Sequence, residues 1–121
     1  MGRLNREHAM QHVEVTFGEF EVIAGNGQSQ AAVMVLPPGE SEGGDRNRHK
    51  GADQWLYVVA GEGRAIVEDK VYPLAPNTLL LIEHGETHEI HSDGNEPLKT
   101  LNFYVPPAYT GGEETLPAGR S

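Results

Sequence analysis

The sequence predicts an all-β domain, a sandwich or barrel built from about nine short strands. Strand-like runs recur at spacings of roughly 8 to 12 residues, Gly, Pro and Asn separate them, and no convincing long helical pattern occurs. At 121 residues the chain is large enough to bury one hydrophobic core but not two. A single all-β domain is therefore expected.

Alternation, turn residues and β-branched content indicate where the strands lie. Residues 11–17 alternate between apolar and polar side chains, as a half-buried strand does. An Ala-Gly-Glu-Gly turn joins residues 54–59 to 63–68, which predicts a hairpin. Residues 40–48 are polar, charged and glycine-containing, and are interpreted as a long surface loop that leads to His49. The other strands are expected at residues 20–24, 31–36, 71–74, 78–82, 87–91 and 98–105.

The domain organisation follows from these strands. We expect a flexible N-terminal arm at residues 1–10, a barrel at residues 11–105 and an irregular C-terminal tail at residues 106–121. Prolines and glycines oppose regular structure in the tail, although Tyr109 and Leu116 could pin it to the barrel surface.

The charge balance argues against nucleic acid as a partner. The chain carries 18 acidic and 9 basic residues, for a formal charge of −9, and nucleic-acid binding rests mainly on a basic face. The basic residues are scattered apart from the group Arg46, Arg48 and Lys50. These three could receive an acidic small molecule, but a solvated loop is the favoured interpretation.

Composition also limits the metal chemistry and the location. The chain has no cysteine, which excludes disulfides, thiolate metal sites and cysteine nucleophiles, and leaves any metal to histidines and oxygen donors. No apolar run approaches the roughly 20 residues of a membrane-spanning helix, and no apolar signal-peptide core follows Arg3 and Arg6. No membrane partner and a cytoplasmic location are expected.

Side-chain parity along the strands brings four polar residues toward one interior. In extended backbone Asn47 and His49 share a face, Gln54 starts a strand whose alternate residues face the same way, and His88 shares a face with Ile90. Imidazole and oxygen donors suit a divalent first-row metal. Each residue also has a simpler interpretation, since His88 could bond a backbone group and Gln54 could be a satisfied core amide. The pocket around this site is expected to be lined by Leu56, Val58, Leu81, Ile90 and Phe103.

The same segments resemble the two signature motifs of the cupin superfamily, G-x5-H-x-H-x3,4-E-x6-G and G-x5-P-x-G-x2-H-x3-N. Counting back from Gly61 puts Gln54 at the glutamate, His49 at the second histidine and Asn47 at the first. The resemblance covers about residues 31–105 and implies a double-stranded β-helix, a jelly-roll-like barrel. In the second motif Gly85 and His88 match, while Asn77, Glu83 and Ser92 stand at the first glycine, the proline and the asparagine.

The resemblance implies a metal site at Asn47, His49, Gln54 and His88 for iron, manganese, nickel or zinc. The family's set of three histidines and one glutamate has lost a histidine and its only negative ligand. A carboxamide oxygen can coordinate a cation but offsets none of its charge, so weaker affinity or a different occupant is expected, and an empty or water-filled pocket is the alternative. Nearby residues that could substitute as ligands are Asp45, Asp53, His84 and His91, although parity puts Asp53 and His91 outside.

Two functions remain open for the barrel. One is a metal-dependent dioxygenase or isomerase acting on a small organic ligand, for which the sequence identifies no catalytic residue. The other is a non-catalytic module that binds a small molecule without metal. A homodimer is also expected, because the family often pairs barrels by exchanging N-terminal strands, and residues 13–17 with the outward Trp55 and Tyr57 would supply an apolar contact.

Overall fold

The computed structural model describes residues 20–44 and 51–109, which form nine β-strands and no helix. Accordingly, this part of the chain offers no long apolar helix of the kind that crosses a membrane. The strands are β1 (Phe20–Gly25), β2 (Gln30–Leu36), β3 (Ser41–Gly44), β4 (Asp53–Ala60), β5 (Gly63–Val67), β6 (Lys70–Leu74), β7 (Leu79–Ile82), β8 (His88–Ser92) and β9 (Leu98–Val105).

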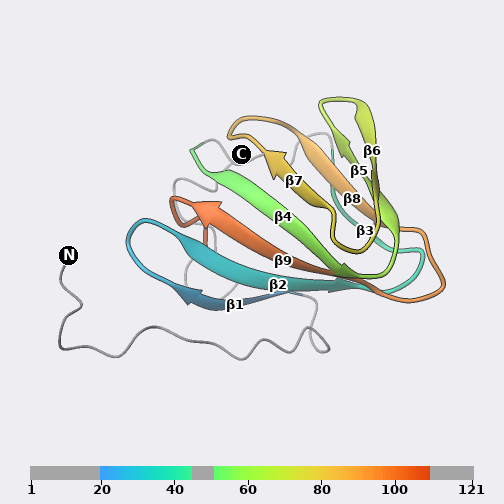
Figure 1. Cartoon of the computed structure of the whole chain (residues 1–121). Helices are drawn as coiled ribbons and strands as arrows, with labels where there is room; N and C mark the ends of the chain where they lie inside the picture. Colours follow the sequence, from blue (N-terminus) through green and yellow to red (C-terminus); the bar gives the residue numbers. More distant parts are fainter. Residues whose placement is uncertain (1–19, 45–50, 110–121) are drawn as a thin grey trace.

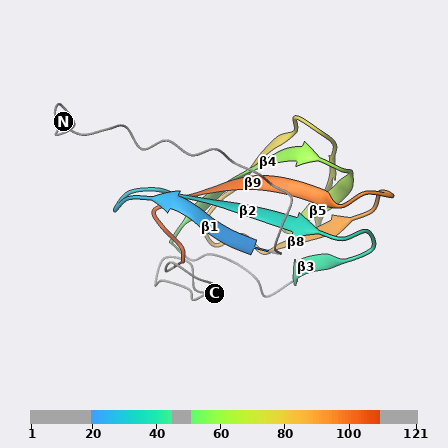
Figure 2. The ribbon, with the colours of Figure 1, turned by 90° about the horizontal axis from the view of Figure 1, so that it is seen from below.

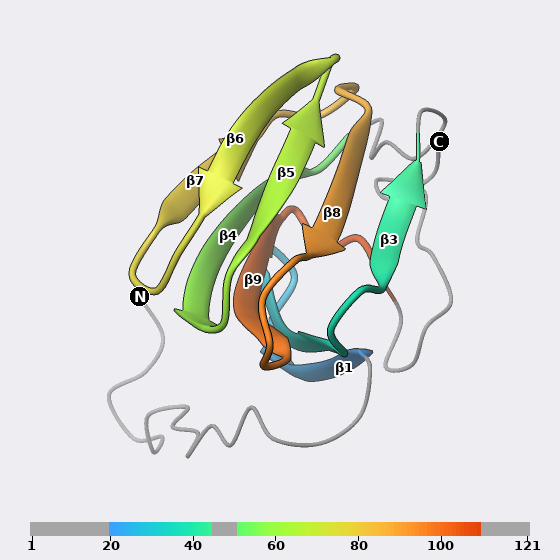
Figure 3. The same ribbon diagram turned by 90° about the vertical axis from the view of Figure 1, so that its right-hand side faces the viewer.

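The strands form two antiparallel sheets packed face to face. The larger sheet has the order β1-β2-β9-β4-β7, and its strands run side by side in Figure 1. The smaller sheet has the order β3-β8-β5-β6, and Figure 3 shows it lying over the larger one. From below, Figure 2 shows β1, β2 and β9 on one layer with β3 on the other. The all-β fold predicted from the sequence is confirmed.

The core lies between the sheets because strand residues alternate between the two faces. In β4, Leu56 and Val58 are fully buried, whereas Trp55 and Val59 on the opposite face are exposed. The smaller sheet contributes Ala65 and other apolar side chains to the same interior. The buried residues of this main cluster are Met34, Leu36, Leu56, Val58, Ala65, Val67, Leu74, Ile82, Ile90 and Leu98.

The turn between β5 and β6 has the backbone of a tight hairpin. Glu68 and Asp69 both have positive φ, 49° and 69°, as a two-residue type I′ turn requires. The Glu68 carboxylate accepts hydrogen bonds from the Thr87 amide and hydroxyl, both at 2.8 Å. These bonds tie the turn to the segment that enters β8.

Strand β3 corrects the prediction of one long surface loop at residues 40–48. Its residues, Ser41–Gly44, pair antiparallel with β8, and Glu42 lies opposite Ile90. A Ser-Glu-Gly-Gly segment has low β-propensity, so the hydrogen bonds to β8 hold it extended. Glu42 consequently faces the same side as Ile90, although it is exposed. The strand expected at residues 11–17 lies outside the described residues.

Candidate binding pocket

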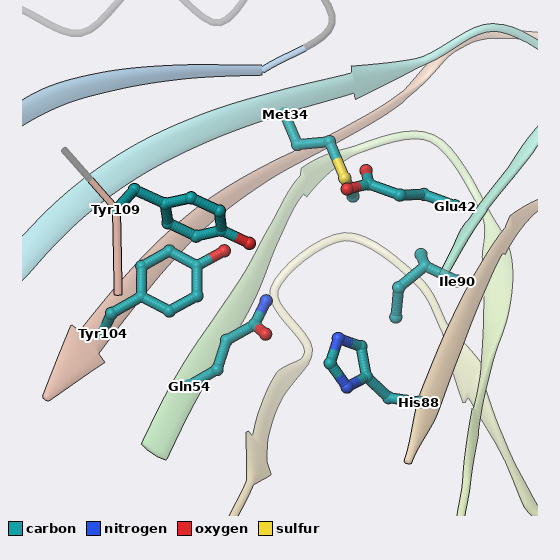
Figure 4. A pocket seen from close by; sticks show the side chains of 7 residues that line it. All are labelled: Met34, Glu42, Gln54, His88, Ile90, Tyr104 and Tyr109. Atoms are coloured by element: carbon teal, nitrogen blue, oxygen red, sulfur yellow. The ribbon is translucent and has the colours of Figure 1, made fainter. Parts of the chain in front are cut away.

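A pocket lies between the two sheets and takes residues from both (Figure 4). The larger sheet supplies side chains from β2, β4 and β9, the smaller sheet supplies them from β3 and β8, and one residue follows β9. Its free volume is about 20 Å³, which is room for roughly a water molecule or a metal ion. The lining residues are Met34, Glu42, Gln54, His88, Ile90, Tyr104 and Tyr109.

Gln54 presents a buried polar atom to this pocket. Its side-chain Nε2 donates to Asn102 Oδ1 at 3.2 Å, and Asn102 Nδ2 donates in turn to Thr100 Oγ1 at 3.0 Å. Gln54 is only 5% exposed, and its Oε1 has no hydrogen-bond partner among the described residues. An unpaired buried carbonyl oxygen costs about 1–3 kcal/mol, which a ligand that donates to it, or a cation, would offset.

Two tyrosines form the far side of the pocket. The Tyr104 and Tyr109 rings pack edge to face with centroids 5.1 Å apart, and their hydroxyls point toward one another in Figure 4. Phe20 packs on the other side of Tyr109, and Gln30 Nε2 donates to the Tyr109 carbonyl at 2.7 Å. These contacts hold the start of the C-terminal tail against the barrel.

The tyrosine hydroxyls stay protonated over the physiological range. Burial, and then the negative charge of Glu42, raise the pKa of Tyr109 to about 12. Burial is also the main cause that raises the pKa of Tyr104 well above its usual value, followed by the charges of Tyr109 and Glu42. Both hydroxyls are therefore neutral groups over that range.

Glu42 is one of four lining residues that the sequence reasoning missed, the others being Met34, Tyr104 and Tyr109. The segment around Glu42 was interpreted as a solvated loop, and nothing in its composition distinguishes it from one. The pairing of Glu42 with Ile90 across β3 and β8 places its side chain on the pocket side of β3, where it is exposed. The pocket thus contains a carboxylate although position 54, the expected place for one, holds an amide.

Of the four residues expected to hold a metal, the structure brings Gln54 and His88 into one pocket. His88 is buried on β8, on the same face as Ile90, which also lines the pocket. Asn47 and His49 lie outside the described residues.

The other expected lining residues lie elsewhere. Leu56 and Val58 belong to the fully buried core rather than to the pocket wall. Leu81 and Phe103 are the register partners of Trp55, so they lie on the outer face of the larger sheet, opposite the pocket. The pocket predictions for Leu81 and Phe103 are corrected, because the alternation of β7 and β9 places the odd-numbered residues there outside.

The substitute ligands considered from the sequence are engaged away from the pocket. His84 Nδ1 lies 2.8 Å from Asp53 Oδ1, and His91 Nε2 lies 2.6 Å from Glu89 Oε1. The hydrogen bond between His84 and Asp53 is the main cause that raises the pKa of His84 and lowers the pKa of Asp53. Asp45 lies outside the described residues.

The donor set fits a cation only if amide oxygen takes part. Within residues 20–44 and 51–109, no three His, Cys, Asp or Glu side chains form a group that could hold a metal ion. His88 and Glu42 are the two of that kind in the pocket lining, and Gln54 adds a carboxamide oxygen. This mixed nitrogen and oxygen set suits a divalent first-row metal.

Comparison with known proteins agrees with the architecture. The family model Cupin_2, described as a cupin domain, matches residues 32–104. An oxalate-binding protein from Thermotoga maritima is 34% identical over 74 residues, which are 61% of this chain and 60% of that protein. The matched region is thus less than two thirds of that relative.

Solved structures share the fold. A Klebsiella pneumoniae protein described as having a double-stranded β-helix domain superposes with a TM-score of 0.70 at 19% identity, covering 91% of this chain and 96% of the other. KdgF from a Halomonas species superposes with a TM-score of 0.65 at 23% identity, covering 86% of this chain and 91% of the other. At these identities the likeness establishes the fold.

Proposed function

Because the chain belongs to the Cupin_2 family of cupin domains, we propose that it binds a divalent metal and a small organic ligand in the pocket between its sheets. The observation that carries the proposal is Gln54 Oε1, a buried oxygen with no hydrogen-bond partner among the described residues, in the pocket that His88 also lines. A cation would satisfy this oxygen, which otherwise carries the cost of desolvation.

The proposed metal ligands are His49, His88, Gln54 and Asn47. The first motif supports Asn47 and His49, and the shared pocket supports the other two. Iron, manganese, nickel and zinc all accept imidazole and oxygen ligands. When bound, the metal would supply Lewis acidity, or a dioxygen site if it is ferrous iron.

The organic ligand is proposed to occupy the mouth of the pocket. The pocket's free volume of about 20 Å³ is too small to enclose it, so it would bind where the pocket opens to solvent. Tyr104 and Tyr109, whose hydroxyls are neutral, line the same pocket and would contact it there. We further propose a dioxygenase or isomerase activity, which a bound metal with a small organic ligand beside it would support.

A non-catalytic binding protein without metal is the second candidate. It is favoured by the carboxamides of Asn47 and Gln54 at two of the four ligand positions, since neither offsets the charge of a metal. The name of the Thermotoga maritima relative, an oxalate-binding protein, is compatible with either candidate.

Elemental analysis of protein purified without a metal-affinity tag tests the proposal. We expect close to one metal per chain in the wild type and loss of that metal in the His49→Ala, His88→Ala double variant. The matched control is His84→Ala, because His84 is an exposed histidine that bonds Asp53 outside the pocket. Wild-type protein that stays metal-free after incubation with each ion would favour the non-catalytic candidate.

We also propose that the protein forms a homodimer through the outer face of the larger sheet. This face carries exposed apolar side chains, whereas the chain as a whole has a charge of −9. Two such chains repel one another over most of their surface, so an uncharged patch is the favourable place for a second copy. The exposed apolar residues of this face are Trp55, Val59, Leu79, Phe103 and Val105.

A further inference from the structure

One side chain ties the segment that follows β9 to the barrel. Gln30, at the start of β2 and 8% exposed, accepts hydrogen bonds at its Oε1 from the amides of Ala108 (3.2 Å) and Tyr109 (3.1 Å). Its Nε2 donates to the Tyr109 carbonyl at 2.7 Å. The oxygen and the nitrogen of one carboxamide are thus both used on this segment, residues 106–109, which we call the strap.

The strap closes one side of the pocket with the ring of Tyr109. This ring lines the pocket and packs against both Phe20 and Tyr104, with centroid distances of 4.9 and 5.1 Å. Ala108 beside it is fully buried, in a small apolar cluster that also contains Tyr104. The strap therefore helps to keep Tyr104 covered, at 3% exposure.

The strap is held differently from the rest of the pocket wall. The six other lining residues lie within strands β2, β3, β4, β8 and β9, whereas Tyr109 lies outside the nine strands. Of those five strands β3 is the one at a sheet edge, and its lining residue Glu42 is already exposed, so moving it would free little buried space. A strand moves only with its ladder of backbone hydrogen bonds, whereas the strap relies on bonds to the side chain of Gln30 and on packing. It is consequently the part of the wall that opens at the lowest free energy.

An organic ligand passes inside the mouth only if part of the wall moves. The free volume of about 20 Å³ admits roughly one water molecule or one metal ion. Displacement of the Tyr109 ring would widen the pocket toward Phe20 and Tyr104, the two rings that it packs against. The two sheets would keep their pairing.

Building on the proposed function, we infer that the strap is a gate for the organic ligand and that Gln30 is the positioning residue that latches the gate closed. When the bonds to Gln30 break, Tyr109 moves away and Tyr104 becomes accessible from the mouth. The barrel stays folded while the gate opens.

Nitration by tetranitromethane, located by peptide mass spectrometry, tests whether the gate admits a small organic molecule. The reagent is itself such a molecule, and it modifies a tyrosine only where it can reach the ring. In the wild type we expect Tyr104 to react roughly tenfold or more slowly than the exposed Tyr72. The Tyr104 rate should be insensitive to low urea concentrations, because a local opening exposes little surface. A Tyr104 rate that rises with urea as global unfolding does would overturn the inference, and this arm needs no variant.

Gln30→Met tests the latch, because methionine keeps the length of the side chain and loses all three hydrogen bonds. We expect nitration of Tyr104, and hydrogen exchange at the amides of Ala108 and Tyr109, to become roughly tenfold faster or more. Gln28→Met is the matched control, since Gln28 is an exposed glutamine two residues earlier, and it should keep the wild-type rates. Unchanged nitration of Tyr104 in Gln30→Met would contradict the latch.

Hydrogen exchange in β4 and β8 separates a latch from a merely structural role. The amides of these strands should keep their wild-type exchange rates in Gln30→Met. If they become faster by the same factor as the strap, Gln30 supports the whole fold and the inference fails. The assays contain no metal, so elemental analysis tests the proposed function separately. A protein that binds metal, but whose Tyr104 reacts only through global unfolding, would defeat this inference alone.

Discussion

Trp55 on β4 lies directly opposite Phe103 on β9, and the two side chains are 39% and 38% exposed. Leu81 on β7 is the other register partner of Trp55, so an apolar row crosses three neighbouring strands on the outer face of the larger sheet. Exposed apolar groups gathered in this way are typical of an interaction surface.

If a second copy covers this row, the mass in solution should be twice 13.2 kDa. Phe103→Glu should convert the dimer to a monomer, because it would bury a carboxylate at the contact on both copies. Light scattering at matched concentrations measures this. Val71→Glu, on β6 of the other sheet and 60% exposed in the wild type, should remain dimeric. A wild-type mass of 13 kDa would reject the homodimer.

Leu56 should behave as a core residue. It is fully buried between the sheets, so Leu56→Ala should lower the free energy of unfolding by about 2–5 kcal/mol through lost burial and the cavity left behind. Leu79→Ala, at a position 57% exposed, should change it by less than about 0.5 kcal/mol in the monomeric Phe103→Glu background. Urea denaturation of both variants would measure the difference, and similar losses would contradict the assignment.

The sequence predicted the strands well where local signals and tertiary pairing agree. The hairpin of β4 and β5 and the inward face of Gln54, Leu56 and Val58 follow from alternation and a glycine turn, both of which are local. Strand β3 could not be predicted in this way, because a Ser-Glu-Gly-Gly segment becomes a strand only through its pairing with β8.

The pocket was predicted less well than the strands, because part of its lining also depends on pairing between distant strands. Gln54 and His88 were found because the spacing within each motif is local, whereas Tyr104 and Glu42 line the pocket through the registers of β9 and β3. Phe103 was assigned to the wrong face because a one-residue change of register exchanges the two faces of a strand. Nothing in the sequence of β9 fixes that register.

Stability should fall with rising pH through the range in which tyrosine ionises. The pKa of Tyr109 rises from 10 to about 12 on folding, and that of Tyr104 shifts in the same direction. Because the unfolded state releases these protons first, the contribution is complete below pH 10 and is lost as the pH rises toward 12. Urea denaturation followed by circular dichroism should show that the free energy of unfolding falls more steeply with pH in the wild type than in the Tyr104→Phe, Tyr109→Phe double variant. Tyr72→Phe, at an exposed position, should keep the wild-type slope.

The exposed pair of His84 and Asp53 should be visible by NMR titration. Its hydrogen bond raises the pKa of His84 above 6.5, so Asp53→Asn should bring that pKa back toward 6.5. The contribution of His84 to the free energy of unfolding is present below pH 6.5 and is lost as the pH rises through the raised pKa of His84. The Asp53 contribution is present above pH 3.8 and is lost as the pH falls through its lowered pKa. An unchanged His84 titration in Asp53→Asn would show that the pair does not form in solution.

A comparison of alanine variants at Gly61 and Gly85 separates the cost of backbone strain from the cost of a steric clash. Both have positive φ, 85° and 84°, a conformation that costs alanine about 1–2 kcal/mol. At Gly85 an added Cβ would meet nothing within 4 Å, so Gly85→Ala should cost only that amount. At Gly61 the Cβ would lie 2.3 Å from the backbone oxygen of Pro97, which leads into β9 and cannot move independently of the sheet.

Gly61→Ala should therefore lower the free energy of unfolding by more than about 3 kcal/mol, roughly twice the loss in Gly85→Ala or more. Urea denaturation of the two variants at one pH measures both values on the same scale. The comparison isolates the close approach, because the two glycines share the same φ and differ in what surrounds the added methyl group. Equal losses would mean that the link between β4 and β5 moves away from Pro97 at little cost, and that this end of the sandwich is less tightly packed than the structure indicates.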